Sequence, residues 1–208
     1  MRRLTLIRHG LTAWNAEGRF QGHTDVPLSD EGRAQARALA DYVAAVQGVD
    51  AVVASPLMRA VETARIAFPD QAIAIDERLR ELHFGVFEGR TLAENEADAA
   101  WPDWVADPYG SAPPEGESYR ALRERAVAWL DDARAEFHGA HVVAVAHSGT
   151  IQMLLADILG VERPRWRKRV YLRHTSVTHV LFRGHDAVVE RVNDTRHLVA
   201  DGEDPFSE

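Results

Sequence analysis

Two arginines and two histidines occur at or just after the ends of three short apolar runs in this chain. Arg8 and His9 follow the first run, Arg59 comes a few residues after the second, and His147 follows the third. Arginine gives phosphate oxygens a planar, permanently charged pair of donors. Histidine can act as a nucleophile when neutral and as a cation when protonated. These residue types are suited to binding and transferring a phosphoryl group.

Three further residues fit the same chemistry. Gly10 and Gly149 lie directly after or close to the two histidines, where backbone amides could approach an anion closely. Glu81 is the candidate general acid, which would protonate a leaving oxygen. Each residue alone is more often structural, in a salt bridge, a buried hydrogen bond or a solvated surface. Their coincidence at the strand ends favours an active site.

The apolar runs are short and continuous, which is typical of buried parallel strands. In open α/β sheets, ligands bind at the carboxyl ends of such strands, so the residues that follow them are expected to meet at one edge. The predicted strands are Leu4–Ile7, Ala51–Ala54, Val142–Ala146 and a weaker one at Ala72–Ile75.

Helical patterns alternate with these strands. Ser29 is placed to cap one helix, and another helix is expected to follow Ser118 and to stop near Gly139. A third helix is predicted over Thr150–Leu159, before Gly160. Alternating strands and helices indicate a central sheet that is covered on both faces.

The C-terminal part has a different pattern. Ser176–Phe182 and Ala187–Val192, joined by a turn at Arg183–Asp186, predict an antiparallel hairpin. We therefore predict an α/β fold: a three-layer sandwich with a mainly parallel central sheet flanked by helices and with antiparallel strands near the C-terminus. The order of the strands is left open.

The chain, residues 1–208, is interpreted as one domain with a cap-like excursion at about 84–119. This stretch is irregular and rich in proline, with Arg90 as its one basic residue among eight acidic ones. Its aromatic residues are expected to face the substrate: Trp101, Trp104 and Tyr109. The acidic tail from residue 200 is expected to fray.

The composition restricts the partners. A net charge of −8 disfavours nucleic acid, whereas a small phosphorylated metabolite needs only a local group of cations. We expect no membrane association and, since the chain has no cysteine and no visible targeting segment, a cytoplasmic location. Edge strands near the C-terminus would allow two subunits to pair as a homodimer.

Several motifs resemble the histidine phosphatase superfamily, the group that includes the phosphoglycerate mutases. LIRHGLTAWN is similar to its N-terminal signature, and the similarity continues through SPLMRAVETA, RELHFGVFEGRT, PPEGES and AHSGTI. The motifs occur in the family's order over most of the chain. The resemblance implies a three-layer α/β fold and a reaction without a metal or other cofactor.

The resemblance also implies roles for individual residues. His9 matches the nucleophile that forms a phosphohistidine, and Glu81 matches the proton donor. Protonated His147 would join the two arginines in stabilising the transition state. The full expected set is His9, Glu81, Arg8, Arg59 and His147 as catalytic residues, and Asn15, Gln21, Gly22 and Ser148 as substrate-binding residues, with no metal ligands.

One position departs from the family pattern. Ser148 stands where the superfamily often has glycine, and it is expected to alter a hydrogen bond near the phosphate. His174 and His197 lie in motifs similar to the family's, but the sequence assigns them no physical role.

The activity has two main interpretations. A mutase must hold a second anionic group, and a cap with one basic residue is poorly suited to that. RELHFGVFEG, PPEGES and YLRHTSVTHVLF also resemble a branch of bacterial broad-specificity phosphatases that includes α-ribazole phosphatases. We therefore predict a metal-independent phosphomonoester hydrolase, with phosphoglycerate mutase as the alternative. A non-catalytic module that binds a phosphorylated ligand is disfavoured, because His9 and Glu81 are both present.

Overall fold

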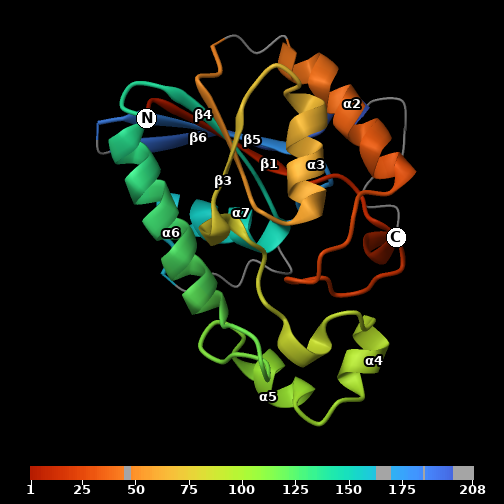
Figure 1. Ribbon diagram of the computed structural model, residues 1–208. Coiled ribbons are helices and arrows are strands. Elements are labelled where there is room, and N and C mark those ends of the chain that lie inside the picture. Colours follow the sequence, from red (N-terminus) through yellow and green to blue (C-terminus); the bar gives the residue numbers. More distant parts are fainter. Residues whose placement is uncertain (45–47, 163–169, 185, 199–208) are drawn as a thin grey trace.

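The computed structural model describes residues 1–44, 48–162, 170–184 and 186–198 (Figure 1). Within these residues, six strands form one sheet in the order β3-β2-β4-β1-β5-β6. The predicted fraying of the tail concerns residues outside the described part of the chain. The strands are β1 (Arg3–Arg8), β2 (Ala51–Ala54), β3 (Ile73–Ile75), β4 (His141–Ala146), β5 (Val177–Arg183) and β6 (Asp186–Asp194).

The sheet is parallel on one side and antiparallel on the other. Strands β1, β4, β2 and β3 run parallel, whereas β5 is antiparallel to β1 and β6 is antiparallel to β5. The predicted strands and the C-terminal hairpin are confirmed, with bounds that shift by up to two residues. The predicted fold class, a mainly parallel sheet with antiparallel strands near the C-terminus, is therefore confirmed.

The predicted helix starts mostly hold. The Ser29 hydroxyl accepts from Gly32 N at the start of α2, and Ser118 accepts from Ala121 N at the start of α6. The helix predicted from Thr150 begins two residues earlier, directly after the strand-end His147. The helices are α1 (Ala13–Ala16), α2 (Asp30–Ala44), α3 (Met58–Ala67), α4 (Leu92–Glu96), α5 (Trp101–Ala106), α6 (Tyr119–Glu136) and α7 (Ser148–Ile158).

None of the described helices combines the length and the apolar composition that crossing a membrane requires.

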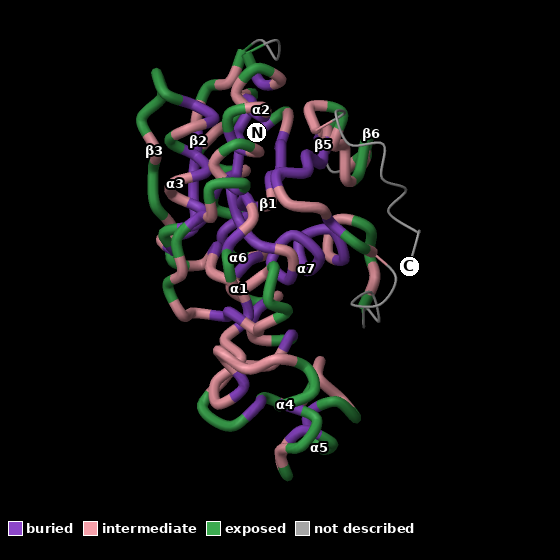
Figure 2. The backbone as a smooth tube through the Cα atoms, turned by 90° about the vertical axis from the view of Figure 1, so that its right-hand side faces the viewer, coloured by how far each residue is buried: buried purple, intermediate pink, exposed green. Residues whose placement is uncertain are grey.

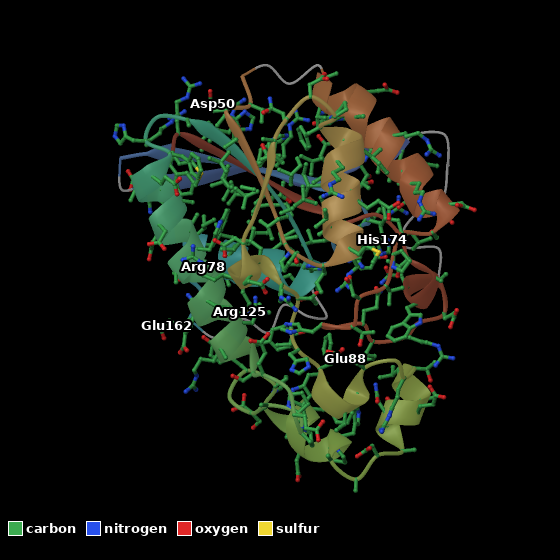
Figure 3. The ribbon with its side chains drawn as sticks, in the orientation of Figure 1. Asp50, Arg78, Glu88, Arg125, Glu162 and His174 are labelled. Atoms are coloured by element: carbon green, nitrogen blue, oxygen red, sulfur yellow. The ribbon has the colours of Figure 1, made fainter. Side chains whose placement is uncertain are left out.

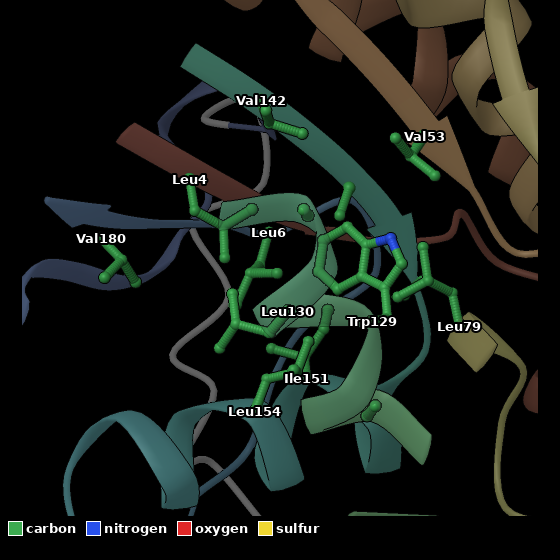
Figure 4. Close-up of a cluster of buried hydrophobic side chains, with 14 of the residues drawn as sticks. Leu4, Leu6, Val53, Leu79, Trp129, Leu130, Val142, Ile151, Leu154 and Val180 are labelled. Atoms are coloured by element: carbon green, nitrogen blue, oxygen red, sulfur yellow. The ribbon is translucent and has the colours of Figure 1, made fainter. Parts of the chain in front are cut away.

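Alternating side chains of the strands form two hydrophobic cores, one on each face of the sheet. Leu4 and Leu6 of β1 pack with α6 and α7 around Trp129 (Figure 4). Ile7, also on β1, packs on the opposite face with α2 and α3 around Leu39. Because side chains alternate along a strand, one run of apolar residues supplies both cores. Helices on both faces complete the three layers seen in Figure 1.

The segment with α4 and α5 has a hydrophobic core of its own. Phe87, Trp101 and Trp104 are buried there and make tilted or edge-to-face ring contacts with one another. Both ribbon and tube views show α4 and α5 projecting away from the sheet, with buried and exposed residues mixed along them (Figure 2). We call this segment, residues 84–119, the cap; its core also contacts Leu122 of α6 and Met153 of α7.

Candidate active site

The strand register explains why the two histidines meet. Arg8, the last residue of β1, pairs with Ala146, the last residue of the neighbouring parallel strand β4. The next residues along the two strands are His9 and His147, so both emerge at the same edge. Their ring centroids lie 5.1 Å apart.

His9 is held as a neutral imidazole whose Nε2 makes no hydrogen bond to the described residues. Its Nδ1–H donates to Gly10 O at 2.7 Å, since a carbonyl can only accept, and this leaves the Nε2 lone pair available. Burial, followed by the charges of Arg59 and Arg8, holds the pKa of His9 well below its ordinary value. Neutral imidazole is the form required for nucleophilic attack.

Arg59 is the deeply buried cation of the site, with 1 % of its surface exposed. Its guanidinium donates to Thr24 O at 3.0 Å and to Gly22 O at 2.8 Å, which fixes its orientation. Burial lowers the pKa of Arg59 to about 10, so the group remains charged at neutral pH. Arg8 lines the same cleft, and the two guanidinium groups together make a strongly positive site.

The imidazole of His147 is uncharged before a substrate binds. Its Nε2 is 2.8 Å from Ser55 Oγ, while its buried Nδ1 has no partner among the described residues. Burial and the charge of Arg59 hold the pKa of His147 well below its ordinary value. The cationic form expected from the sequence therefore needs the negative charge of a phosphate beside the ring.

Glu81 reaches the cleft from the segment after β3. Its carboxylate accepts from Leu82 N at 2.8 Å and from Gly149 N at 3.1 Å. Its backbone carbonyl accepts from Arg125 of α6 and from His23, each at 2.8 Å (Figure 3). The carboxyl group of Glu81 is thus held from several directions at the cleft wall.

The sequence predicts that Gly10 and Gly149 let backbone amides approach an anion, and the amides of both glycines already have protein partners. Gly10 N donates to Thr63 Oγ1 at 3.0 Å, and Gly149 N donates to Glu81. Gly10 is needed for a different reason. A Cβ atom there would lie 2.6 Å from Gly32 O, so the loop after β1 packs directly against the start of α2.

Three of the four predicted substrate-binding residues line the cleft: Asn15, Gln21 and Gly22. The Oδ1 of Asn15 accepts from Thr12 N, whereas the buried Oε1 of Gln21 has no partner among the described residues. Gly22 has a φ of +52°, and a Cβ atom there would collide with the carboxylate of Glu88. Glycine is therefore required at this turn.

Ser148 is not brought to the cleft. It is the first residue of α7, and its hydroxyl accepts from Gln152 Nε2 at 3.4 Å. The departure from the family pattern at this position therefore lies outside the residues that line the cleft in the described structure.

Sequence reasoning missed two residues that organise the site. Glu88 accepts from His23 N and Thr24 N at 2.8 Å and from Phe84 N at 3.1 Å, and so fixes the loop that carries Gly22. Arg125 donates to the backbone carbonyl oxygens of Arg78, Arg80 and Glu81, and so holds the segment that carries the Glu81 carboxyl group. Both are charged residues on segments where solvent exposure is the usual expectation, and no signal within the sequence shows that they are half-buried and hydrogen-bonded.

The cleft has a volume of about 260 Å³ and one apolar wall. Phe20 and Phe84 form this wall, with their rings edge to face at 5.0 Å. Trp101 and Trp104 lie behind it, 7 % and 1 % exposed, and do not line the cleft. The prediction that these tryptophans face the substrate is wrong, because the short helices of the cap need them as their own core. Tyr109, predicted with them, is likewise packed against that core.

Three further arginines, on or near the cap side of the cleft, are engaged with other groups. Arg19 lines the cleft, but it pairs with Glu17 at 2.7 Å and donates to Gly89 O. Arg90, the basic residue of the cap, pairs with Asp98 at 2.7 Å. Arg120 lies over the ring of Tyr109.

Within the described residues, no three His, Asp or Glu side chains are grouped so that they could hold a metal ion.

Comparison with known proteins agrees with this site. The family model for histidine phosphatase superfamily (branch 1) matches residues 4–195. The chain belongs to this superfamily, as the motifs of its sequence indicated.

Individual relatives carry names of both expected activities. The Escherichia coli protein named "Probable phosphoglycerate mutase GpmB" is 35 % identical, with 96 % of each chain covered. The phosphoserine phosphatase of Entamoeba histolytica, solved with 3-phosphoglyceric acid, is 30 % identical with a TM-score of 0.86, covering 96 % of this chain and 100 % of the other. The α-ribazole phosphatase of Shigella flexneri is 26 % identical with a TM-score of 0.85, covering 93 % and 96 %.

Proposed function

We propose that this member of the superfamily is a metal-independent phosphomonoester hydrolase that acts through a phosphohistidine on His9. The observation that carries the proposal is the state of His9. Its imidazole is buried and neutral, and its Nε2 makes no hydrogen bond within the part of the chain that the structure describes, while Arg8, Arg59 and Glu81 line the same cleft.

The first half of the reaction follows from these groups. The Nε2 lone pair of His9 attacks phosphorus, and the ester P–O bond breaks. The leaving oxygen takes the bonding electrons and a proton from Glu81. Arg8 and Arg59 stabilise the charge on the transferred phosphoryl oxygens, and His147 becomes cationic as that charge builds.

The second half restores the enzyme. Glu81, now a carboxylate, removes a proton from a water molecule, which attacks the phosphohistidine. The P–N bond breaks and its electrons return to His9 Nε2. Inorganic phosphate leaves, and Glu81 holds the proton again for the next cycle.

The surroundings of the cleft favour hydrolysis over mutase activity. A mutase must retain a carboxylate-bearing intermediate for return transfer. Here Arg19 and Arg90 are already paired with carboxylates, and the leaving-group side has an apolar wall of Phe20 and Phe84. Water is therefore expected to take the phosphoryl group before a second organic acceptor does.

A mutase activity remains the second candidate because the relative named "Probable phosphoglycerate mutase GpmB" matches almost the whole chain. The deciding experiment measures phosphate release from aryl and alkyl phosphomonoesters beside interconversion of 2- and 3-phosphoglycerate. We expect stoichiometric phosphate release, little interconversion, and unchanged rates after dialysis against a chelator. Interconversion faster than phosphate release would establish the mutase instead. A chelator-induced loss restored by a divalent metal would contradict metal independence.

A further inference from the structure

The guanidinium of Arg8 is held by the segment that precedes β5. Nη1 donates to Leu172 O at 2.5 Å, and Nη2 is 2.8 Å from His174 Nε2. Arginine has N–H donors and no acceptor, so the His174 nitrogen must accept. His174 is therefore neutral, with its proton on Nδ1, and serves as an acceptor for a cation of the active site.

His174 also lies beside the nucleophile. Its ring centroid is 5.8 Å from that of His9, and His174 is labelled in Figure 3. Burial and the charge of Arg8 lower the pKa of His174 to about 2. The ring consequently stays an acceptor throughout the pH range in which an enzyme of this kind would work.

The residue after His174 has a strained backbone. Thr175 is fully buried and has a φ of +54°, a conformation that β-branched residues rarely adopt. Strain of this kind persists only where surrounding contacts determine the conformation, and it gathers at functional sites.

The contacts that hold Thr175 connect it to the site. Its amide donates to His9 O at 3.3 Å, and its hydroxyl donates to His174 O at 2.8 Å. Since that hydroxyl hydrogen is used, His197 must donate from Nε2 to Thr175 Oγ1, 3.0 Å away. The strained turn thus directs the His174 side chain toward Arg8.

We infer that His174 is a positioning residue, which fixes the Arg8 guanidinium so that its remaining N–H groups face the phosphate. The buried Nε of Arg8 has no partner among the described residues, and the side chain lines the cleft. Leu172 and His174 use two of the five N–H groups of the guanidinium, and the hydroxyl of Tyr171 also interacts with the group. The N–H groups that these three residues do not engage can donate to the ligand. The inference rests on the proposed function, because it assigns Arg8 to the phosphate.

The test is a double-mutant cycle. His174→Leu removes the acceptor at similar volume, and His174→Gln keeps an acceptor. Each is combined with Arg8→Ala. His138→Leu, at an exposed position of the chain, is the matched control.

We expect His174→Leu to lower kcat for p-nitrophenyl phosphate at least tenfold with a smaller change in KM, and His174→Gln to stay within about threefold of the parent. In the Arg8→Ala background, His174→Leu should lower kcat by less than twofold, because His174 acts through Arg8. An equal loss in both backgrounds, or no loss in the parent, would overturn the inference. If His174→Leu fails to fold, a large loss of kcat in His174→Gln at unchanged Tm would also overturn the inference.

Calorimetric binding of inorganic phosphate separates the two proposals. His174→Leu should weaken phosphate binding several-fold, and His174→Gln should restore it. If the parent releases no phosphate from any ester but shows this binding pattern, the proposed function fails and the role of His174 stands. Unchanged phosphate affinity in His174→Leu would overturn the positioning role even in an active phosphatase.

Discussion

The imidazole of His9 lies beside two guanidinium groups in a buried cleft, and protonation of the ring is opposed by both burial and like charge. The same forces act on His147, whose pKa is also lowered. A phosphate dianion placed among these groups reverses the balance, since it favours every nearby positive charge. In the proposed mechanism, His9 is therefore ready to attack before the substrate binds, and His147 gains its charge afterwards.

The role of Glu81 as proton donor gives a prediction about leaving groups. Glu81→Gln should slow hydrolysis of alkyl phosphates by about 10²–10⁴-fold, the usual contribution of general acid catalysis. A nitrophenolate needs less protonation, so formation of the phosphoenzyme from p-nitrophenyl phosphate should slow much less. Pre-steady-state kinetics on both esters measures the difference. Equal losses would mean that Glu81 only positions the phosphate.

The sequence identified the residues at strand ends but not those that hold them. Three of these residues, Arg8, His9 and His147, lie at or directly after the end of an apolar run. Arg59 lies in the first turn of the helix that follows another run. The rule that ligands bind at the carboxyl ends of strands is enough to group all four. His174 was visible in a motif, but its role depends on the φ angle of Thr175 and on the position of Arg8. The φ angle of Thr175 and the position of Arg8 both depend on tertiary contacts, which the spacing of residues in the sequence does not predict.

At the scale of elements, the cap and the loop after α1 form the substrate side of the cleft. Phe20 belongs to that loop and Phe84 precedes the cap helices, and their rings meet edge to face. The ring of Trp101 lies 5.7 Å from Phe20, and the ring of Trp104 lies 5.9 Å from Phe84, both edge to face. The cap core therefore fixes the wall that a leaving group would touch.

This arrangement predicts a selective effect of the wall. Phe20→Ala and Phe84→Ala should each lower kcat/KM for aryl phosphates by about tenfold, since burying an aromatic leaving group against a ring contributes roughly 1–2 kcal/mol. A small alkyl phosphate should lose less. Leu92→Ala, at an exposed position of α4, is the matched control and should leave kcat/KM unchanged for both substrates. Parallel losses for both substrates would contradict a direct contact.

The elements themselves were largely predictable, and their order was not. Runs such as Ala51–Ala54 appear as strands with the predicted bounds because a buried parallel strand needs a continuous apolar sequence. The order of the strands depends on which edges pair, and the sequence pattern is similar for each of them. The tryptophans of the cap were misassigned for a related reason: composition does not reveal whether an aromatic residue lines a cleft or fills a core.

At the scale of the whole molecule, several histidines are buried in the uncharged state. The pKa values of His9 and His147 are held well below the ordinary 6.5, that of His141 is about 4 and that of His174 about 2, with burial as the largest cause in each case. In the unfolded chain these groups bind protons near pH 6.5, whereas in the folded chain they do not. Folding stability is therefore complete above pH 6.5 and decreases as the pH falls below it.

The magnitude is measurable. Each such histidine removes up to about 1.4 kcal/mol of unfolding free energy per pH unit below 6.5. Urea unfolding at pH 7 and pH 5 should therefore differ by at least about 2 kcal/mol, and His174→Gln should reduce the difference. Equal unfolding free energies at the two pH values would show that the histidines are not buried as neutral groups.

The homodimer and the cytoplasmic location stay predictions from the sequence.

The most direct measurement of the proposed mechanism is the identification of the phosphorylated residue. The protein is mixed with a phosphomonoester, quenched in alkali within milliseconds to seconds, digested, and analysed by mass spectrometry. We predict an acid-labile, alkali-stable phosphate on the peptide that contains His9, formed and lost at rates that account for turnover and absent in His9→Ala. A phosphate on another residue, or substantial phosphatase activity in His9→Ala, would contradict the central claim that His9 is the nucleophile.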